Sequence, residues 1–481
     1  MKKIIIIGGG IAGLAAAYRI QKEISEGAPL ECILLEGGDR FGGKIATERS
    51  DGFVIERGPD SFISQKPAAI QFCQQLGIGD HLVSTNPETP NTYVYTGGKL
   101  VTMPDGLSLM IPTRFLPFAL TPLFSLPGKI RMAFDLLIPK KADENDESLA
   151  SFVRRRMGEE ALRKMAEPML AGIYASDPET MSIGSTFPMF VETERKYRSL
   201  ILGMLARKKA MLLNGRPKSN FSLFMTLKDG LGEMVEAVIK KSPDIQFQSG
   251  SRVESISGKE GDWSVRLEGG GEYQAQALIL ATPGPITARF LQSVTPKAAE
   301  LLKQIKYVST ATVTIAYKKE GFSHALDGFG FVVPKCEGRS ILACTWTSSK
   351  FPHRAPEGYV MLRCYLGGAL QEDIAEKDEQ TLANLVRQDL GKIMGIHEEP
   401  VFCKVFHNRK SNVQYQVNHS GRIDAIMQEL QEGLFLAGSA YRGIGIPDCI
   451  QNGTQSAESA IELLMGKPKG ETWHLKPKDN E

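Results

Sequence analysis

Residues 1–13 are Met-Lys-Lys-Ile-Ile-Ile-Ile-Gly-Gly-Gly-Ile-Ala-Gly, and an alanine-rich stretch follows them. The apolar run at 4–7 is typical of a buried parallel strand, and the stretch from Leu14 to Ser25 is typical of a helix. A strand that turns through glycines into a helix forms a dinucleotide pyrophosphate site, where free N–H groups at the helix start face the phosphates. We therefore predict pyrophosphate contacts from Gly8, Gly9, Gly10, Ile11, Ala12 and Gly13.

A second apolar run at 31–35 ends at Glu36, which lies 23 residues after Gly13. At this spacing an acidic residue meets the ribose hydroxyls of a bound dinucleotide. We therefore predict that Glu36 binds the ribose. The alternative is an ordinary βαβ unit whose glycines serve only its turns.

A similar pattern recurs near the other end of the chain, where Gly433-Leu-Phe-Leu-Ala-Gly438 precedes Gly443-Ile-Gly-Ile-Pro-Asp-Cys-Ile450. It predicts a second strand that turns through glycines into a helix. A nucleotide domain assembled from both ends of a long chain favours a bound flavin over a visiting nicotinamide. We predict that Ile444, Gly445 and Ile446 contact this cofactor.

The segment Glu36-Gly-Gly-Asp-Arg-Phe-Gly-Gly-Lys44 resembles the glycine-doublet signature of the amine oxidase and phytoene desaturase flavoproteins. Arg40 can place a fixed positive charge near the pyrophosphate, and the doublet lets the backbone approach the cofactor. The resemblance implies FAD, with the turn at 58–61 beside the flavin and Val253 on the adenine. The further cofactor residues are Gly37, Arg40, Gly43, Lys44, Gly58, Pro59, Asp60, Ser61, Val253 and Thr282.

Length and composition limit the classes of protein to which this chain can belong. A chain of 481 residues suggests two or three domains, and 42% hydrophobic with 23% charged residues is typical of a soluble globular protein. The net charge of +2 argues against a nucleic-acid binder. The seven cysteines include no Cys-x-x-Cys pair, so we expect neither a disulfide framework nor a metal site.

No signal peptide is expected, because the first residues pass directly into the nucleotide strand, and a cytoplasmic location fits best.

The most apolar stretch, 115–128, has only 14 residues and includes three prolines. A membrane span needs roughly 20 apolar residues. This stretch is better suited to an apolar pocket or to peripheral contact with a membrane surface.

The predicted architecture is α/β, with a Rossmann-type FAD-binding domain assembled from residues 1–62, 220–297 and 408–466. Residues 63–95 and 298–407 are predicted to form an α+β substrate domain around an antiparallel sheet. Residues 96–219 form a mainly helical insert, and the polar tail 467–481 is expected to be disordered.

The helical insert carries excess positive charge, with 19 Lys and Arg against 13 Asp and Glu, a net charge of +6 over 96–219. The densest clusters are Arg154–Arg156 and Arg207–Lys209. They predict contact with anionic lipid, docking of a polycarboxylate or partner, or simply a solvated helix face.

The insert also resembles the porphyrinogen oxidases of haem synthesis, through Glu147-Ser-Leu-Ala-Ser-Phe152, Glu167-Pro-Met-Leu-Ala-Gly-Ile-Tyr-Ala-Ser-Asp177 and Ser185-Thr-Phe-Pro188. Further similarities at 344–347 and 445–450 make the chain most similar to the Gram-positive coproporphyrinogen III oxidases, formerly grouped with protoporphyrinogen oxidases. The resemblance extends from about Lys3 to Met465.

This resemblance implies a six-electron oxidation of coproporphyrinogen III to coproporphyrin III, with three O₂ reduced to three H₂O₂. The alternatives are a protoporphyrinogen IX oxidase, an oxidase of amines or carotenoid precursors, and a porphyrin-binding flavoprotein without turnover. Transient contact with other haem-synthesis enzymes also follows from the resemblance. No catalytic base stands out.

Cationic anchors are needed for the substrate carboxylates, and Lys66 is the first candidate, with Arg442 the weaker one. Asn408 stands where the wider superfamily has a Trp that helps to close the flavin site, so we count it among the cofactor contacts. Ser439-Ala-Tyr-Arg442 occupies the turn that often carries a flavin-linked cysteine in amine oxidases. Because Cys449 falls in the following helix, we expect noncovalent FAD.

Overall fold

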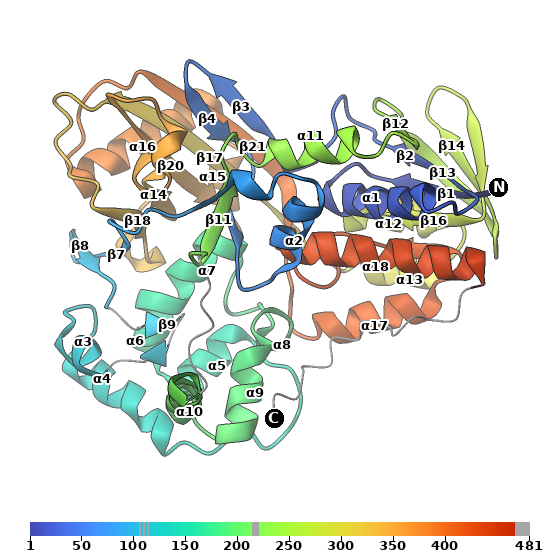
Figure 1. Cartoon of the computed structure of the whole chain (residues 1–481). Coiled ribbons are helices and arrows are strands. Elements are labelled where there is room, and N and C mark those ends of the chain that lie inside the picture. Colours follow the sequence, from blue (N-terminus) through green and yellow to red (C-terminus); the bar gives the residue numbers. More distant parts are fainter. Residues whose placement is uncertain (105–106, 109–110, 113–114, 214–220, 467–481) are drawn as a thin grey trace.

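The computed structural model describes residues 1–104, 107–108, 111–112, 115–213 and 221–466 (Figure 1). At its centre is a five-stranded sheet in the order β12-β2-β1-β16-β22, and every neighbouring pair is parallel. Its strands are β1 (Lys2–Ile7), β2 (Leu30–Leu35), β12 (Ile245–Gln248), β16 (Ala277–Leu280) and β22 (Leu434–Leu436). Three distant parts of the chain thus meet in one sheet, as the sequence predicts.

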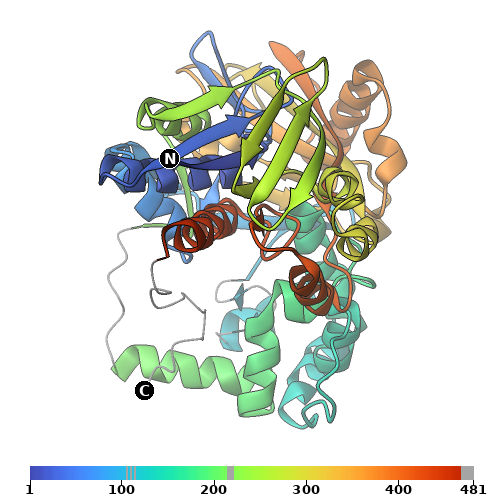
Figure 2. The same ribbon diagram turned by 90° about the vertical axis from the view of Figure 1, so that its right-hand side faces the viewer.

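The central sheet is covered on both faces, which explains the unbroken apolar run of β1. Ile4 and Ile6 pack under α1 (Ile11–Ser25), α11 (Gly232–Lys240) and α18 (Ile446–Met465). Ile5 and Ile7 face the opposite cluster. There the covering elements are β13 (Val253–Lys259), β14 (Asp262–Leu267), β15 (Glu272–Ala275), α12 (Gly284–Leu291), α13 (Pro296–Lys303) and α17 (His419–Glu429) (Figure 2).

A second, seven-stranded sheet has the order β21-β17-β20-β19-β18-β7-β8. All neighbouring strands are antiparallel except β18 and β7. The strands are β7 (Asn91–Thr96), β8 (Lys99–Thr102), β17 (Tyr307–Lys318), β18 (Gly328–Val332), β19 (Ala343–Thr345), β20 (Tyr359–Gly367) and β21 (Phe402–Val413). One face is apolar and packs against α16 (Glu379–Met394).

Short elements connect the two sheets. The hairpin β3 (Thr47–Ser50) and β4 (Phe53–Glu56) places Phe53 and Ile55 against Ala316 and Met361 of the seven-stranded sheet. The neighbouring elements are β5 (Phe62–Ile63), α2 (Ala68–Gln75), β6 (Leu82–Ser84), β11 (Phe224–Leu227), α14 (Thr347–Lys350) and α15 (Glu372–Ala375). The turn 58–61 between β4 and β5 therefore lies at the junction of the two sheets.

Residues 115–213 form the helical insert, at the bottom of both views (Figures 1 and 2). Its elements, with two short strands before them, are β9 (Leu107–Ser108), β10 (Ile111–Pro112), α3 (Phe115–Leu120), α4 (Leu126–Ala133), η2 (Phe134–Leu136), α5 (Leu149–Arg156), α6 (Glu159–Ala161), η3 (Leu162–Ala166), α7 (Glu167–Tyr174), α8 (Ile183–Thr186), α9 (Pro188–Tyr197) and α10 (Leu200–Leu213). No helix among the described residues is long and apolar enough to cross a membrane.

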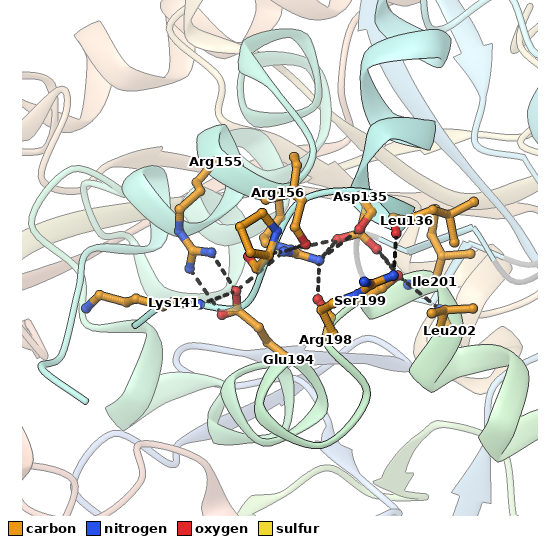
Figure 3. A network of polar contacts seen from close by, with 12 residues as sticks. Asp135, Leu136, Lys141, Arg155, Arg156, Glu194, Arg198, Ser199, Ile201 and Leu202 are labelled. Atoms are coloured by element: carbon orange, nitrogen blue, oxygen red, sulfur yellow. Dashed lines mark hydrogen bonds and ion pairs between the residues drawn. The ribbon is translucent and has the colours of Figure 1, made fainter. Parts of the chain in front are cut away.

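A buried ion pair holds the insert together (Figure 3). Arg156 is fully buried, and its Nε donates to Oδ1 of Asp135 at 2.7 Å. Its Nη1 and Nη2 donate to main-chain oxygens of Asp135, Ile138, Pro139 and Arg198. The predictions of lipid contact, substrate docking or a solvated face for the Arg154–Arg156 cluster are therefore wrong for Arg156, because a side chain without exposed surface reaches none of them.

Three details of the predicted domain limits can be placed on the structure. The limit at 407/408 falls inside β21, and Lys99–Thr102, assigned to the insert, forms β8 of the seven-stranded sheet. The tail 467–481 lies outside the described residues.

Candidate active site

The glycine loop between β1 and α1 has the geometry of a pyrophosphate site. A Cβ on Gly13 would lie 2.0 Å from the carbonyl oxygen of Gly8, so helix and strand approach too closely for a side chain there. A Cβ on Gly10 would meet nothing within 4 Å, so one side of the loop is open. Gly10 is also the N-cap of α1 and supplies no side-chain acceptor to the first turn. The N–H groups in the first turn of an α-helix have no partner within the helix, so the start of α1 is suited to an anion.

Glu36 follows β2 and reaches the same loop. Its Oε2 accepts a hydrogen bond from the Gly9 N–H at 2.7 Å, and its Oε1 accepts one from the Gly38 N–H at 2.7 Å. Each carboxylate oxygen keeps a second lone pair for a ribose hydroxyl. The N–H of Ser251 donates to the Glu36 carbonyl oxygen, which brings the segment before Val253 to this end of the sheet.

The glycine doublet lies against the glycine loop, with the Gly42 N–H donating to the Gly9 carbonyl oxygen at 2.7 Å. Arg40 donates to the carbonyl oxygens of Phe41, Gly43 and Ile45, so its charge braces this loop. Lys44 keeps accessible surface, yet desolvation by the surrounding protein lowers its pKa. Lys44 is therefore partly enclosed by protein beside this loop.

The C-terminal turn joins the site from the other side of β1. Gly453 of α18 packs so closely on α1 that a Cβ there would lie 2.1 Å from the Ala12 carbonyl oxygen. The N-cap of α18 is Gly445, between Ile444 and Ile446. A Cβ on Gly8 would lie 2.6 Å from the carbonyl oxygen of Ala281, which places Thr282 and its turn at the loop as well.

Tyr415 and His419 support this C-terminal turn. The Tyr415 hydroxyl donates to the Ser439 carbonyl oxygen at 2.9 Å and accepts from the Gly443 N–H at 2.8 Å. The His419 ring stacks on Tyr415 with centroids 3.9 Å apart, and its Nε2 lies 3.1 Å from the Tyr441 carbonyl oxygen. The turn is thus held by buried hydrogen bonds.

The turn 58–61 faces a cluster of buried charges. Lys350 Nζ lies 3.4 Å from Asp60 Oδ2 and donates to Ser61 Oγ at 3.2 Å. Burial opposes ionisation of Asp60, but the charges of Lys350 and Arg363 outweigh it and lower the pKa of Asp60 to about 2. Asp60 is therefore a fixed carboxylate at neutral pH.

The two predicted substrate cations, Lys66 and Arg442, form ion pairs within the protein, and Asn408 and Cys449 lie in regular secondary structure. Lys66 Nζ lies 2.6 Å from Oδ1 of Asp448, in the first turn of α18, so Lys66 adjoins the C-terminal turn. Arg442 pairs with Asp424 at 2.5 Å on the exposed surface. Asn408 lies in β21 opposite Thr310. Cys449 lies inside α18 and is buried, and burial raises its thiol pKa to about 12, which is consistent with noncovalent FAD.

Three residues near this turn are not among the predicted site residues: Lys350, Arg363 and Tyr365, whose ring lies under the Arg363 guanidinium. One signal for Arg363 was available, since it is the only charged residue in the apolar run 359–366. An isolated charge within a buried strand is costly and calls for a partner or a ligand. Tyr365 had no comparable signal, because a tyrosine in a strand is ordinary.

The fold and the glycine loops together define a class, the FAD-dependent oxidoreductases with a split nucleotide domain. The family model "flavin containing amine oxidoreductase" matches residues 11–461, and the chain belongs to this family. The cofactor of this family is FAD, and the open loop at Gly10, the start of α1 and the Glu36 carboxylate fit that group.

Within this family, the chain is similar to individual porphyrinogen oxidases over nearly its whole length. The chain is 38% identical to the coproporphyrinogen III oxidase of Bacillus subtilis (strain 168), over 96% of this chain and 99% of that protein. It is 32% identical to the coproporphyrinogen III oxidase of Staphylococcus aureus, over 96% of this chain and 100% of that protein. A crystal structure from Exiguobacterium sp. 255-15, provisionally named a protoporphyrinogen oxidase, superposes with a TM-score of 0.85 at 33% identity, covering 96% of this chain and 99% of the other.

Proposed function

We propose that this chain oxidises coproporphyrinogen III to coproporphyrin III. The observation that carries the proposal is the similarity to two bacterial coproporphyrinogen III oxidases over nearly the whole length of all three chains. Similarity of that extent includes the insert and the seven-stranded sheet, so it covers the substrate-binding parts as well as the nucleotide domain.

The proposed reaction removes six electrons in three two-electron steps, and dioxygen accepts them to give three H₂O₂ per porphyrin. Bound FAD supplies the hydride acceptor for each step. The chain supplies the positioning. The Gly58–Ser61 turn and the N-terminus of α18 would border the flavin, and Lys66 would offer a cation at the C-terminal turn. A substrate carboxylate that binds Lys66 would replace Asp448 as the ion-pair partner of Lys66.

Porphyrin fluorescence tests this function directly. Purified FAD-loaded protein is mixed in air with chemically reduced coproporphyrinogen III, and peroxide release is measured in parallel. We expect coproporphyrin to appear faster than by autoxidation, with three H₂O₂ per porphyrin. Absence of any acceleration by a visibly yellow protein would contradict the proposal, and porphyrin binding without peroxide would indicate a carrier.

Protoporphyrinogen IX is the second candidate substrate, because the Exiguobacterium relative carries a protoporphyrinogen oxidase name. Running both porphyrinogens at equal concentration separates the candidates. We expect the higher kcat/KM with coproporphyrinogen III, and the reverse order would assign the second function.

Peripheral membrane contact is part of the proposal and rests on a stripe of exposed apolar side chains in the insert. Four side chains are exposed and recur at helical spacing along α4, η2 and the residue that follows η2: Leu126, Ile130, Phe134 and Leu137. Leu120 at the end of α3 is also exposed. An exposed apolar stripe of this kind is suited to the surface of a bilayer.

Flotation with lipid vesicles checks this contact. We expect the wild-type protein to float with anionic vesicles and the variant Leu126→Ser/Ile130→Ser to remain at the bottom. The matched control is Leu463→Ser, an exposed leucine on α18 of the nucleotide domain. Equal flotation of all three proteins would reject a membrane role for the stripe.

A further inference from the structure

Arg363 lies on the polar face of the seven-stranded sheet. Val313, Ile315, Leu362 and Cys364 belong to the apolar cluster packed with α16. Side chains alternate along a strand, so the residues between them occupy the other face. That face carries Arg363 opposite Thr314 and Thr345, and Tyr365 opposite Thr312.

The hydrogen bonds of Arg363 are incomplete. Its side chain is only 3% exposed, and Nη2 donates to the Gly58 carbonyl oxygen. Among the residues that the structure describes, its Nε and Nη1 have no hydrogen-bond partner. The hydroxyls of Thr312 and Thr314 on the same face are likewise buried and unpartnered within the described chain. Buried donors of this kind are rare, because a polar group that loses water and gains no partner destabilises the fold.

Charge is also unbalanced around Arg363. Glu56 and Asp60 are the carboxylates of the cluster, and Lys350, Arg354 and Arg363 are its cations. The cluster therefore carries one surplus positive charge. Removing Arg363 would leave two cations facing two carboxylates.

Partly accessible side chains adjoin this surplus charge. Thr345, Tyr365 and Asp60 keep part of their surface accessible. Nevertheless, burial raises the pKa of Tyr365 to about 12, so the residue is surrounded by protein. This face of the sheet therefore keeps accessible surface beside the Gly58–Ser61 turn.

We propose that Arg363 binds a carboxylate on the inner edge of the macrocycle and thereby selects a substrate with four carboxylates over one with two. This inference rests on the proposed function. Protoporphyrinogen IX carries its two propionates on adjacent pyrroles, so both can remain at the pocket mouth. Coproporphyrinogen III carries one on each pyrrole, so insertion by any edge brings carboxylates into the interior.

A buried carboxylate is strongly disfavoured unless a cation with free donors receives it. Arg363 meets this requirement, because it has a surplus charge and two unused donor groups. Lys66 is half exposed and adjoins the C-terminal turn, so it suits a carboxylate that both porphyrinogens present.

The variants Arg363→Leu and Arg363→Lys test the assignment. Binding of coproporphyrin III and protoporphyrin IX is measured by fluorescence titration of the FAD-loaded protein, together with FAD content and Tm. We expect Arg363→Leu to weaken coproporphyrin binding about 10- to 100-fold and to leave protoporphyrin binding within about threefold. Arg363→Lys keeps the charge, so its affinity for coproporphyrin should lie between that of wild type and that of Arg363→Leu. FAD content and Tm should stay close to wild type.

Lys66→Ala is the matched control and should weaken both porphyrins by the same factor. Equal loss of both porphyrins in Arg363→Leu, no loss of either, or loss of FAD would each overturn the assignment. A large drop in Tm would also overturn it, because the charge would then be structural.

Failure of the wild-type protein to bind or oxidise coproporphyrinogen III would instead reject the proposed function. A wild type that prefers coproporphyrinogen III, with an Arg363→Leu variant of unchanged preference, would reject only the role of Arg363.

Discussion

Two buried arginines in this protein have opposite surroundings. Every N–H group of Arg156 in the insert is directed at Asp135 or at a main-chain oxygen. Arg363 beside the Gly58–Ser61 turn has one hydrogen bond and two unused donor groups within the described structure. The difference separates a closed polar network, which holds the fold, from an open one, which has room for a ligand.

If that comparison is right, removing a member of a closed network should lower stability, whereas removing a member of an open network should lower ligand affinity. The largest stability effect is expected for Arg156→Leu, because it leaves Asp135 buried without its cation. Such a loss costs about 3–5 kcal/mol. Thermal or urea unfolding of the FAD-loaded protein measures it.

Arg154→Leu is the control, because Arg154 is 43% exposed and pairs with Glu159 and Glu179 at the surface. A surface pair contributes about 1 kcal/mol or less. If Arg156→Leu and Arg154→Leu lower the free energy of unfolding equally, the closed network around Arg156 does not determine the loss of stability.

His419 provides the next test, since it supports the C-terminal turn through its stacking on Tyr415 and its contact with the Tyr441 carbonyl oxygen. Burial lowers its pKa from 6.5 to about 4. Between these values the unfolded chain binds a proton that the folded chain does not, so stability present above pH 6.5 is lost as the pH falls toward 4. The loss amounts to about 3 kcal/mol.

The variant His419→Phe keeps the stacking on Tyr415 and removes the titration, so Tm should fall less steeply between pH 6.5 and 4. Some slope should remain, because burial and Arg354 also lower the pKa of His353 to about 4. A Tm profile parallel to that of wild type would exclude His419 as the titrating group.

Glu36→Ala should affect the cofactor more than the fold, because the carboxylate oxygens have lone pairs left for the ribose. Loss of a charged acceptor weakens FAD binding by about 1.5–3 kcal/mol, or roughly 10- to 150-fold. Dissociation of FAD is followed by flavin fluorescence, with the exposed neighbour Asp39→Ala as control. A Glu36→Ala protein that stays as tightly loaded as wild type would refute the ribose contact.

Lys66→Ala should have the smallest effect, because Lys66 is half exposed and already pairs with Asp448. A contact made equally in the ground and transition states raises KM and leaves kcat nearly unchanged. We expect a rise in KM of about three- to tenfold, and a smaller rise for Arg442→Ala. Steady-state kinetics with coproporphyrinogen III measures both, and unchanged kinetics would identify Lys66 as a surface residue.

The sequence alone determined the nucleotide half of the protein. The runs at 4–7 and 31–35, the glycines at 8–13 and the helix after Gly445 appear in the structure where their patterns predict them. These features are local: a strand, a tight turn and a helix start each follow from neighbouring residues. The pairing of the runs at 4–7 and 31–35 in one sheet follows from the topology of the βαβ unit.

Tertiary structure alone decided the partners of the charged residues. Arg363 and Gly58 are 305 positions apart, and Lys350 and Asp60 are 290 apart. The Arg154–Arg156 run is a further example. Its sequence suggests a surface cluster, but Arg156 is fully buried in an ion pair with Asp135. Local pattern shows that a charge is present, but the packing of distant elements decides whether it is neutralised, solvated or left with donors for a ligand.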